Sequence, residues 1–185
     1  MMAKIRNILA NMRIRQTARR MDSGLKDFPG ALRDPKHILV CLPAGLRELT
    51  LVKQFLPTIT EIFKPAEIAL LCVPGIKVND IFPRKGFQIL SPSSDQLTWS
   101  GLPKQSYIDS LRDMKIDLVL DLNLQQSNFT SSVLLSFPEA VRIGRGNHLG
   151  RPYYNLEIKT KYLRDERNIY RSLLDTIKLI KDSSH

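Results

Sequence analysis

The sequence predicts an α/β protein: a Rossmann-like, doubly wound and mostly parallel sheet in a single domain. Short apolar runs alternate along the 185 residues with longer segments that carry apolar residues at helical spacing. Such alternation is typical of parallel strands joined by right-handed helical crossovers. The apolar runs lack the alternation of apolar and polar residues that is typical of a strand with one solvent-exposed face. We therefore expect helices to cover both faces of the sheet.

The first predicted strand is the apolar run 38–42, which the turn 43–45 ends. Residues 46–63 follow with apolar side chains three and four positions apart, which predicts a helix with one buried face. Pro57 lies inside this helix and either kinks it or marks its true start. In a doubly wound domain the turn after a strand lies at the carboxyl edge of the sheet, where ligands bind. We therefore expect residues 43–48 to form the floor of any site.

The remaining elements follow from the same patterns. Further strands are expected at residues 67–73, 87–90, 116–122, 140–143 and 156–158, and further helices at 105–114, 125–137 and 165–180. Residues 78–82 can form a helical turn, and the polar stretch 91–102 is expected to be a loop. The glycines at 144 and 146 are expected to end the fifth strand.

The basic residues are concentrated at the N-terminus. Residues 1–36 contain nine Lys and Arg and three Asp and Glu, which is most of the formal net charge of +10. Residues 1–21 contain no acid, and the spacing of Ile5, Ile8, Leu9 and Met12 predicts a basic amphipathic helix. Residues 24–35 contain two Gly and two Pro and predict a linker. We therefore divide the chain into an arm and linker, 1–35, and a domain, 36–185.

Three interpretations of the arm remain open. In the first, the arm packs on its own domain or on a partner chain, or frays as a tail. In the second, it lies on an anionic membrane surface. In the third, it binds nucleic acid or an acidic partner. We favour the first, place the membrane surface through residues 1–21 second, and consider nucleic acid unlikely.

Composition limits the function classes. The hydrophobic content is 43% and the charged content 25%, as in ordinary globular chains, and no apolar run approaches the roughly 20 residues of a membrane-spanning helix. No secretory signal is recognisable, so we expect a cytoplasmic protein. Cys41 and Cys72 lie in predicted strands and are interpreted as core residues. The histidines lack metal-ligand spacing, and we expect neither metal nor cofactor.

Four segments carry a resemblance to a known family. They are HILVCLPAGLRE (37–48), KPAEIALLCVPG (64–75), MKIDLVLDLN (114–123), and AVRIGRG (140–146) followed by YYNLEI (153–158). In this order, residues 36–180 resemble the N-terminal domain of the lipopolysaccharide heptosyltransferases, glycosyltransferase family 9.

The resemblance implies one half of a GT-B fold, in which two Rossmann-like domains face each other across a cleft. In this family the N-terminal domain receives a lipid-linked sugar acceptor. The C-terminal domain holds the nucleotide-sugar donor, and no metal is needed. By this resemblance, we expect residue 185 to fall where the interdomain linker would begin and the donor domain to be absent. We therefore expect an acceptor half that is associated with cell-envelope sugar transfer at the inner face of the membrane. We expect it to be inactive alone, unless a second chain supplies the donor domain.

An alternative function comes from another class. The Rossmann-like domain would then be a non-enzymatic scaffold or interaction module, which its basic arm docks to a membrane, a partner protein or nucleic acid.

The resemblance also suggests a catalytic residue. The family's base is an acid in a Leu-Gly-Asp turn, and this sequence has Leu46, Arg47 and Glu48 there. Glu48 is the candidate base. It is one methylene longer than Asp, and Arg47 replaces a glycine that lets the turn pass close to substrate. Alternatively, Glu48 is an ordinary first-turn acid favoured by the helix dipole, and we favour this interpretation.

Arg47, Asn123, Gln126 and Arg145 are the candidate acceptor-binding residues. Asn123 and Gln126 belong to a polar cluster after the fourth strand, which can receive sugar hydroxyls or cap the next helix. Arg145 lies between glycines, where a guanidinium and free backbone donors can bind an anion. Asp121 either hydrogen-bonds neighbouring turns, which we favour, or contacts a ligand. We expect Glu48, Asn123 and Arg145 to converge on one pocket.

Overall fold

The fold was obtained as a computed structural model that describes residues 2–21, 28–76, 78, 81–82, 86–146 and 149–183. Within these residues, six strands form one sheet in the order β3-β2-β1-β4-β5-β6, and every neighbouring pair is parallel. The strands are β1 (His37–Cys41), β2 (Glu67–Leu71), β3 (Gln88–Leu90), β4 (Leu118–Asp121), β5 (Val141–Arg145) and β6 (Leu156–Ile158). This is the strand order of a Rossmann-type domain, so the predicted fold class is confirmed.

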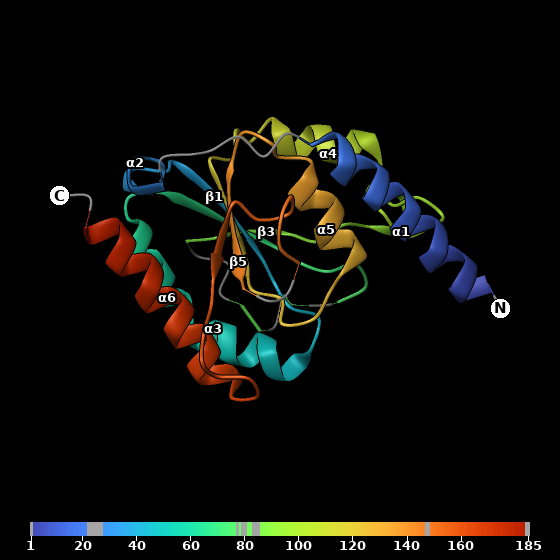
Figure 1. Cartoon of the computed structure of the whole chain (residues 1–185). Helices are drawn as coiled ribbons and strands as arrows, with labels where there is room; N and C mark the ends of the chain where they lie inside the picture. The colour runs from blue at the N-terminus through green and yellow to red at the C-terminus, as the bar shows by residue number, and fades with distance from the viewer. Residues whose placement is uncertain are drawn as a thin grey trace.

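Helices cover both faces of the sheet (Figure 1). On one side lie α2 (Phe28–Arg33), α3 (Leu46–Phe63) and α6 (Glu166–Asp182). On the other lie α4 (Gln105–Arg112) and α5 (Asn128–Leu135), with α1 (Met2–Arg20) packed along α5. The predicted loop 91–102 contains a short 3-10 turn, η1 (Ser94–Gln96). None of the described helices is long and apolar enough to cross a bilayer.

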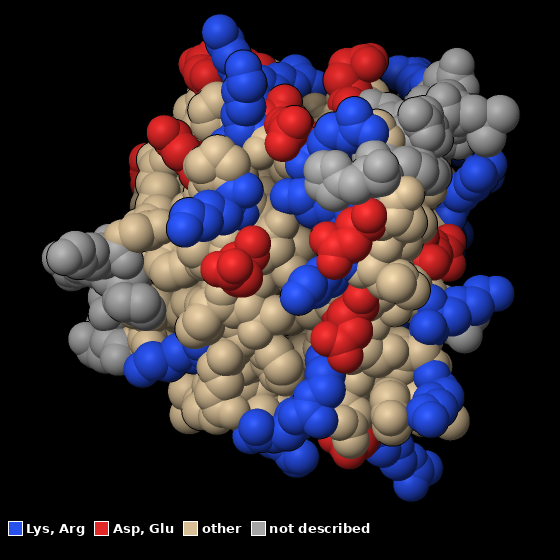
Figure 2. Space-filling model, turned by 90° about the vertical axis from the view of Figure 1, so that its left-hand side faces the viewer, with Lys and Arg blue, Asp and Glu red and all other residues tan. Residues whose placement is uncertain are grey.

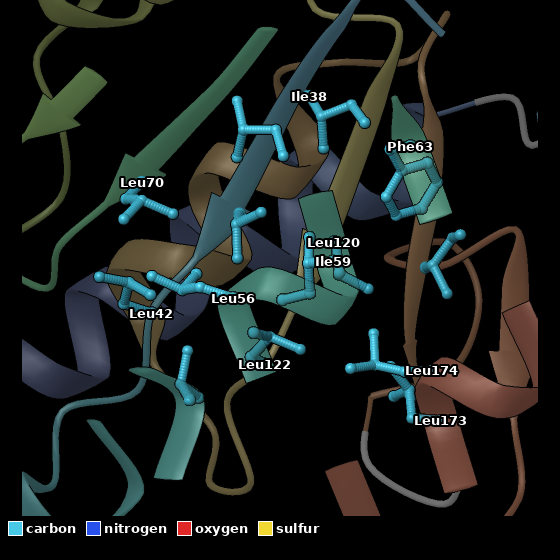
Figure 3. Packing of buried hydrophobic residues seen from close by; sticks show 14 of the residues in the cluster. Ile38, Leu42, Leu56, Ile59, Phe63, Leu70, Leu120, Leu122, Leu173 and Leu174 are labelled. Carbon is cyan, nitrogen blue, oxygen red and sulfur yellow. The ribbon is translucent and has the colours of Figure 1, made fainter. Parts of the chain in front are cut away.

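The first strand shows why residues 38–41 are uniformly apolar. Ile38 and Val40 belong to the core under α3 and α6, whereas Leu39 and Cys41 belong to the core under α4 and α5. All four side chains are at most 1% exposed. Figure 3 shows the first of these cores, in which α3 and α6 pack onto the sheet. Because helices cover both faces of the sheet, no side chain of this strand segment can face solvent, and apolar residues are favoured at every position.

Two elements have the bounds that the sequence predicts, namely α3 and β6. Pro57 lies inside α3, which begins at Leu46, so the alternative in which Pro57 marks the start of the helix is wrong. The prediction that Gly144 ends the fifth strand is also wrong, because β5 continues to Arg145. Gly144 has a packing role: a Cβ there would overlap the ring of Tyr154.

The N-terminal helix packs on its own domain, but not with the predicted face. Ala10 and Ile14 are buried against Leu102 and Leu135. The predicted apolar stripe faces outward, and its residues Ile5, Ile8, Leu9 and Met12 are all exposed. The packing alternative for α1 is therefore the one observed, with the opposite side of the helix in contact.

The predicted linker 24–35 contains a helix. Within it, α2 places Leu32 in the core under α3 and α6, where this side chain is fully buried. Residues 24–27 lie outside the described residues. The predicted turn at 78–82 is present as far as it is described, since the amides of Ile81 and Phe82 both donate to the carbonyl of Val78. Residues 79 and 80 of this turn also lie outside the described residues.

Candidate functional site

The strand order reverses between β1 and β4, and this is where a doubly wound sheet binds ligands. The two strands are paired in register up to their carboxyl ends, where Cys41 lies opposite Asp121. The chain leaves β1 toward α3 on one face of the sheet and leaves β4 toward α5 on the other. The two turns therefore diverge and leave a crevice between them.

A cavity of about 310 Å³ opens in this crevice. We call it the switch-point pocket. Residues 43–45 and Glu48 line it on the β1 side, and residues 123–127 line it on the β4 side. Its volume is at the lower end of the range for small-molecule sites, about 300 to 1,000 Å³. Other cavities lie around His37 at the amino edge of the sheet, where this fold does not place its ligands.

Glu48 lies in the wall of the switch-point pocket. It is the third residue of α3, and its carboxylate folds back over Gly45, where a Cβ would overlap the carboxylate. A carboxylate at this position interacts favourably with the N-terminal end of the helix dipole. The same carboxylate borders the cavity, where it can accept a proton from a bound hydroxyl. The geometry is thus compatible with both interpretations of Glu48.

Asn123 is fixed in the pocket wall by Asp121. One carboxylate oxygen of Asp121 accepts hydrogen bonds from the backbone amide of Asn123, at 3.0 Å, and from its Nδ2, at 2.7 Å. The other accepts a hydrogen bond from Tyr154 Oη at 2.6 Å. Burial and the adjacent Asp121 carboxylate raise the pKa of Tyr154, which keeps this hydroxyl a donor. Asp121 therefore holds neighbouring residues, which is the role we favoured.

Of the two roles expected for the polar cluster after β4, helix capping is observed, and other residues of the cluster line the switch-point pocket. Ser127 is the N-cap of α5, and its side chain accepts a hydrogen bond from the Thr130 amide at 3.3 Å. Gln126 is exposed at the rim of the switch-point pocket, and Asn123 is buried in its wall. Two amide side chains and one carboxylate consequently border the same small cavity.

The structure does not bring the two candidate arginines to this pocket. Arg47 is 81% exposed, and its Nε lies 3.0 Å from Glu166 Oε2, so that it links the first turns of α3 and α6. It lines a separate cavity of about 770 Å³. Arg145 donates a hydrogen bond to the carbonyl of Tyr162 at 3.4 Å. Of the five candidate site residues, Glu48, Asn123 and Gln126 converge.

Tyr170 is a residue near the site that the sequence did not single out. Its hydroxyl donates to the carbonyl of Leu122 at 3.0 Å and ties α6 to the turn after β4. Burial raises its pKa, and the nearby Glu48 carboxylate adds to this effect. On the sequence, Tyr170 is one more large residue on the buried face of α6, so no local signal distinguishes it.

Neither thiol has the properties of a ligand or a nucleophile. Cys41 and Cys72 are buried and free, and burial raises the pKa of both. A buried thiol of raised pKa is an inert core residue, as the sequence suggested. Among the described residues, no three His, Cys, Asp or Glu side chains lie close enough together to hold a metal ion.

Comparison with solved structures identifies similar folds. The structure of the E. coli heptosyltransferase WaaC with ADP aligns with a TM-score of 0.55 and 12% identity, over 76% of this chain and 46% of that chain. A glycosyltransferase family 9 protein from Veillonella parvula DSM 2008 aligns with a TM-score of 0.55 and 16% identity, over 84% of this chain and 43% of that chain. No protein-family model and no curated protein matches the sequence. The chain thus spans less than half of either solved structure, and the likeness shows a shared fold.

Proposed function

We propose that this chain is the acceptor-side half of a glycosyltransferase of the family 9 type, and that the switch-point pocket receives a sugar acceptor. The observation that carries the proposal is the convergence of Glu48, Asn123 and Gln126 on one cavity at the switch point. Carboxylate and amide groups suit the hydroxyls of a sugar, since they accept and donate hydrogen bonds. The fold shared with a heptosyltransferase supports this substrate class.

In this proposal, Glu48 would accept the proton of the acceptor hydroxyl as that oxygen forms a bond to the anomeric carbon of the donor sugar. The bond between that carbon and the nucleotide would break, and the nucleotide would leave. The donor would be held by a second domain or a second chain, as the resemblance to the family implies. We propose that the 185 residues alone bind the acceptor without transferring sugar. Two further features disfavour transfer, namely the longer Glu side chain and the bulky Arg47. A displacement of about 1 Å can lower a rate by roughly 100-fold.

The proposed setting is the cytoplasmic side of the cell envelope, where a lipid-linked sugar acceptor would be presented.

Ligand titration with NMR detection tests acceptor binding. The isotopically labelled chain would be titrated with a neutral monosaccharide, because the described residues that border the pocket include a carboxylate and no basic side chain, and we expect amide shift changes at residues 44–48 and 123–127. Gln126→Ala should weaken binding about tenfold, the equivalent of roughly 1.4 kcal/mol. Gln54→Ala, on the exposed side of α3, is the matched control and should leave binding unchanged. Shifts confined to the amino edge around His37, or equal binding by both variants, would contradict the proposal.

A transfer assay tests the second part of the proposal. The purified chain would be incubated with nucleotide sugars and the same acceptor, beside the variant Glu48→Gln. We expect no product above background from either protein. Turnover that depends on Glu48 would show that the 185 residues suffice for catalysis, and the claim of inactivity would then be wrong.

A further inference from the structure

The N-terminal helix has two apolar faces, and only one of them is used by the fold. The first face is buried: Ala10 and Ile14 pack against residues before α4 and at the end of α5. The second face is solvent-exposed. It consists of five side chains that are between 42% and 73% exposed, namely Met2, Ile5, Ile8, Leu9 and Met12. With 3.6 residues per turn, these five project from the side of the helix opposite Ala10 and Ile14.

The outward stripe is bordered by positive charge. The helix contains six basic residues and no acid: Lys4, Arg6, Arg13, Arg15, Arg19 and Arg20. At the same helical period, Lys4 and Arg15 border one side of the stripe, while Arg6 and Arg13 border the other. The face that carries α6 differs, because Figure 2 shows acidic and basic side chains intermingled across it. The described residues of α1 thus carry positive charge only.

We propose that the outward face of α1 docks the protein on an anionic lipid surface, with the helix axis parallel to the membrane. The stripe would enter the boundary between headgroups and acyl chains, and the flanking Lys and Arg would pair with anionic headgroups. Basic side chains with long aliphatic stems can bury their stems and keep their charges at this depth. This inference uses no residue of the switch-point pocket and is independent of the proposed function.

A lipid surface fits these observations better than nucleic acid does. Nucleic-acid backbones are bound by charged and polar groups, which would leave five aliphatic side chains facing phosphates. A lipid interface satisfies both the stripe and its basic borders. The helix is also already folded on α5 at the periphery of the molecule, as Figure 1 shows, with its outward face free of the described domain. Docking then needs no ordering of a flexible segment, which would weaken binding.

Vesicle co-sedimentation of the full chain tests the proposal. We expect binding to vesicles of phosphatidylcholine and phosphatidylglycerol, and at least tenfold weaker binding to phosphatidylcholine alone. Binding to the anionic vesicles should also weaken as salt increases, because exposed charges are screened. The double variant Ile8→Asp with Met12→Asp should lower affinity for anionic vesicles at least tenfold. Both residues are exposed, at 58% and 62%, so the fold should be retained, and circular dichroism would check this.

A matched double variant separates the stripe from net charge. Leu163→Asp with Leu179→Asp adds the same two charges just before and within α6, at side chains that are 77% and 70% exposed. We expect this control to bind vesicles within twofold of the unmodified chain. If both double variants lose the same vesicle affinity, the added negative charge alone explains the loss, and the proposal is overturned. Absence of vesicle binding, or DNA binding in its place, would also overturn it.

The two proposals can fail separately. The variant with Ile8→Asp and Met12→Asp should bind the neutral monosaccharide as the unmodified chain does, because neither residue lies near the switch-point pocket. Loss of vesicle binding with intact sugar binding would support docking through α1, whatever the outcome for the pocket.

Discussion

Tyr107 carries a buried hydroxyl that has no hydrogen-bond partner among the described residues. The side chain is 6% exposed and lies in the core under α4 and α5. Burial, with a smaller contribution from the thiols of Cys72 and Cys41, raises its pKa to about 12. The ionised form is therefore disfavoured in the folded protein, which makes stability depend on pH in the alkaline range.

Replacing Tyr107 by Phe should reduce this alkaline sensitivity. Below about pH 10 the hydroxyl is protonated in both the folded and the unfolded chain, and it contributes no pH dependence. Between about pH 10 and 12 the unfolded chain loses the proton and the folded chain retains it. Tyr107 then lowers the free energy of unfolding by about 1.4 kcal/mol per pH unit. Denaturant unfolding at pH 8, 10 and 11 would measure the difference between Tyr107→Phe and the unmodified chain.

The measurement at pH 8 is the control for this prediction. There the substitution removes only an unpaired hydroxyl, and we expect a change of less than about 1 kcal/mol. Identical alkaline slopes for the two proteins would show that Tyr107 ionises as readily in the folded state as in the unfolded state.

At the residue scale, the sequence predicts positions within one element better than partnerships between elements. Strand periodicity placed Asp121 and Asn123 at the carboxyl end of β4, and the structure brings both to the switch-point region. The partners Tyr154 and Tyr170 could not be predicted in the same way. Their hydroxyls bond to groups 33 and 48 residues away in sequence. Such links depend on the sheet order, which no local pattern specifies.

At the scale of elements, Arg142 holds the segment before β6 against the start of β5. Its side chain is fully buried. Nε donates to the carbonyl of Tyr153 at 2.9 Å, and Nη1 donates to the carbonyl of Phe137 at 2.6 Å. Burial lowers the pKa of the guanidinium. The planar guanidinium presents donors in a fixed fork that reaches carbonyls on both segments at once, whereas a lysine ammonium is a point charge on a flexible stem.

Replacing Arg142 by Lys should therefore loosen this connection. Buried carbonyls left without a donor cost about 1 to 3 kcal/mol each, so we expect a loss of roughly 2 to 4 kcal/mol in the free energy of unfolding. The amides of Tyr154 and Asn155 should also exchange with solvent faster. Denaturant unfolding and hydrogen exchange would measure the two effects.

Arg112→Lys provides the matched control for this prediction. Arg112 donates through Nε to the carbonyl of Ser136 at 3.2 Å, but its side chain is 50% exposed. Water can replace this donor, and we expect a change below about 0.5 kcal/mol. Equal effects of the two substitutions would mean that Arg142 stabilises the protein no more than an exposed arginine does.

The helices show which patterns are sufficient for prediction. In α3, large apolar residues recur on one face, and the predicted bounds are the observed ones. In α1, the most apolar side faces outward, because the small side chain of Ala10 allows close packing on α5 together with Ile14. The periodicity argument assumes that the most apolar face is the buried one. It fails where a small residue lies at the contact.

At the scale of the whole molecule, the strand-helix alternation predicts a parallel doubly wound sheet but not the strand order. The order β3-β2-β1-β4-β5-β6 places β1 and β4 at the centre, covered by helices on both faces. The edge strands β3 and β6 have three residues each and are partly exposed. Stability should therefore decrease from the centre of the sheet to its edges.

Hydrogen exchange across the sheet should follow this gradient. Amides of β1 and β4 are expected to exchange only through global unfolding, because their strands are paired on both sides and buried on both faces. Amides of β3 and β6 should exchange at least about 100-fold faster through local opening, a difference of roughly 2.7 kcal/mol. Mass spectrometry of the unmodified chain would measure these rates, with β1 as the internal reference.

This gradient bears directly on the proposed site. The switch-point pocket is formed by the turns that follow β1 and β4, which are the two strands expected to open last. Local opening at the edges would then leave Glu48 and Asn123 in place, as a preformed binding site requires. Exchange in β1 as fast as that in β6 would mean that the pocket walls open together with the edges.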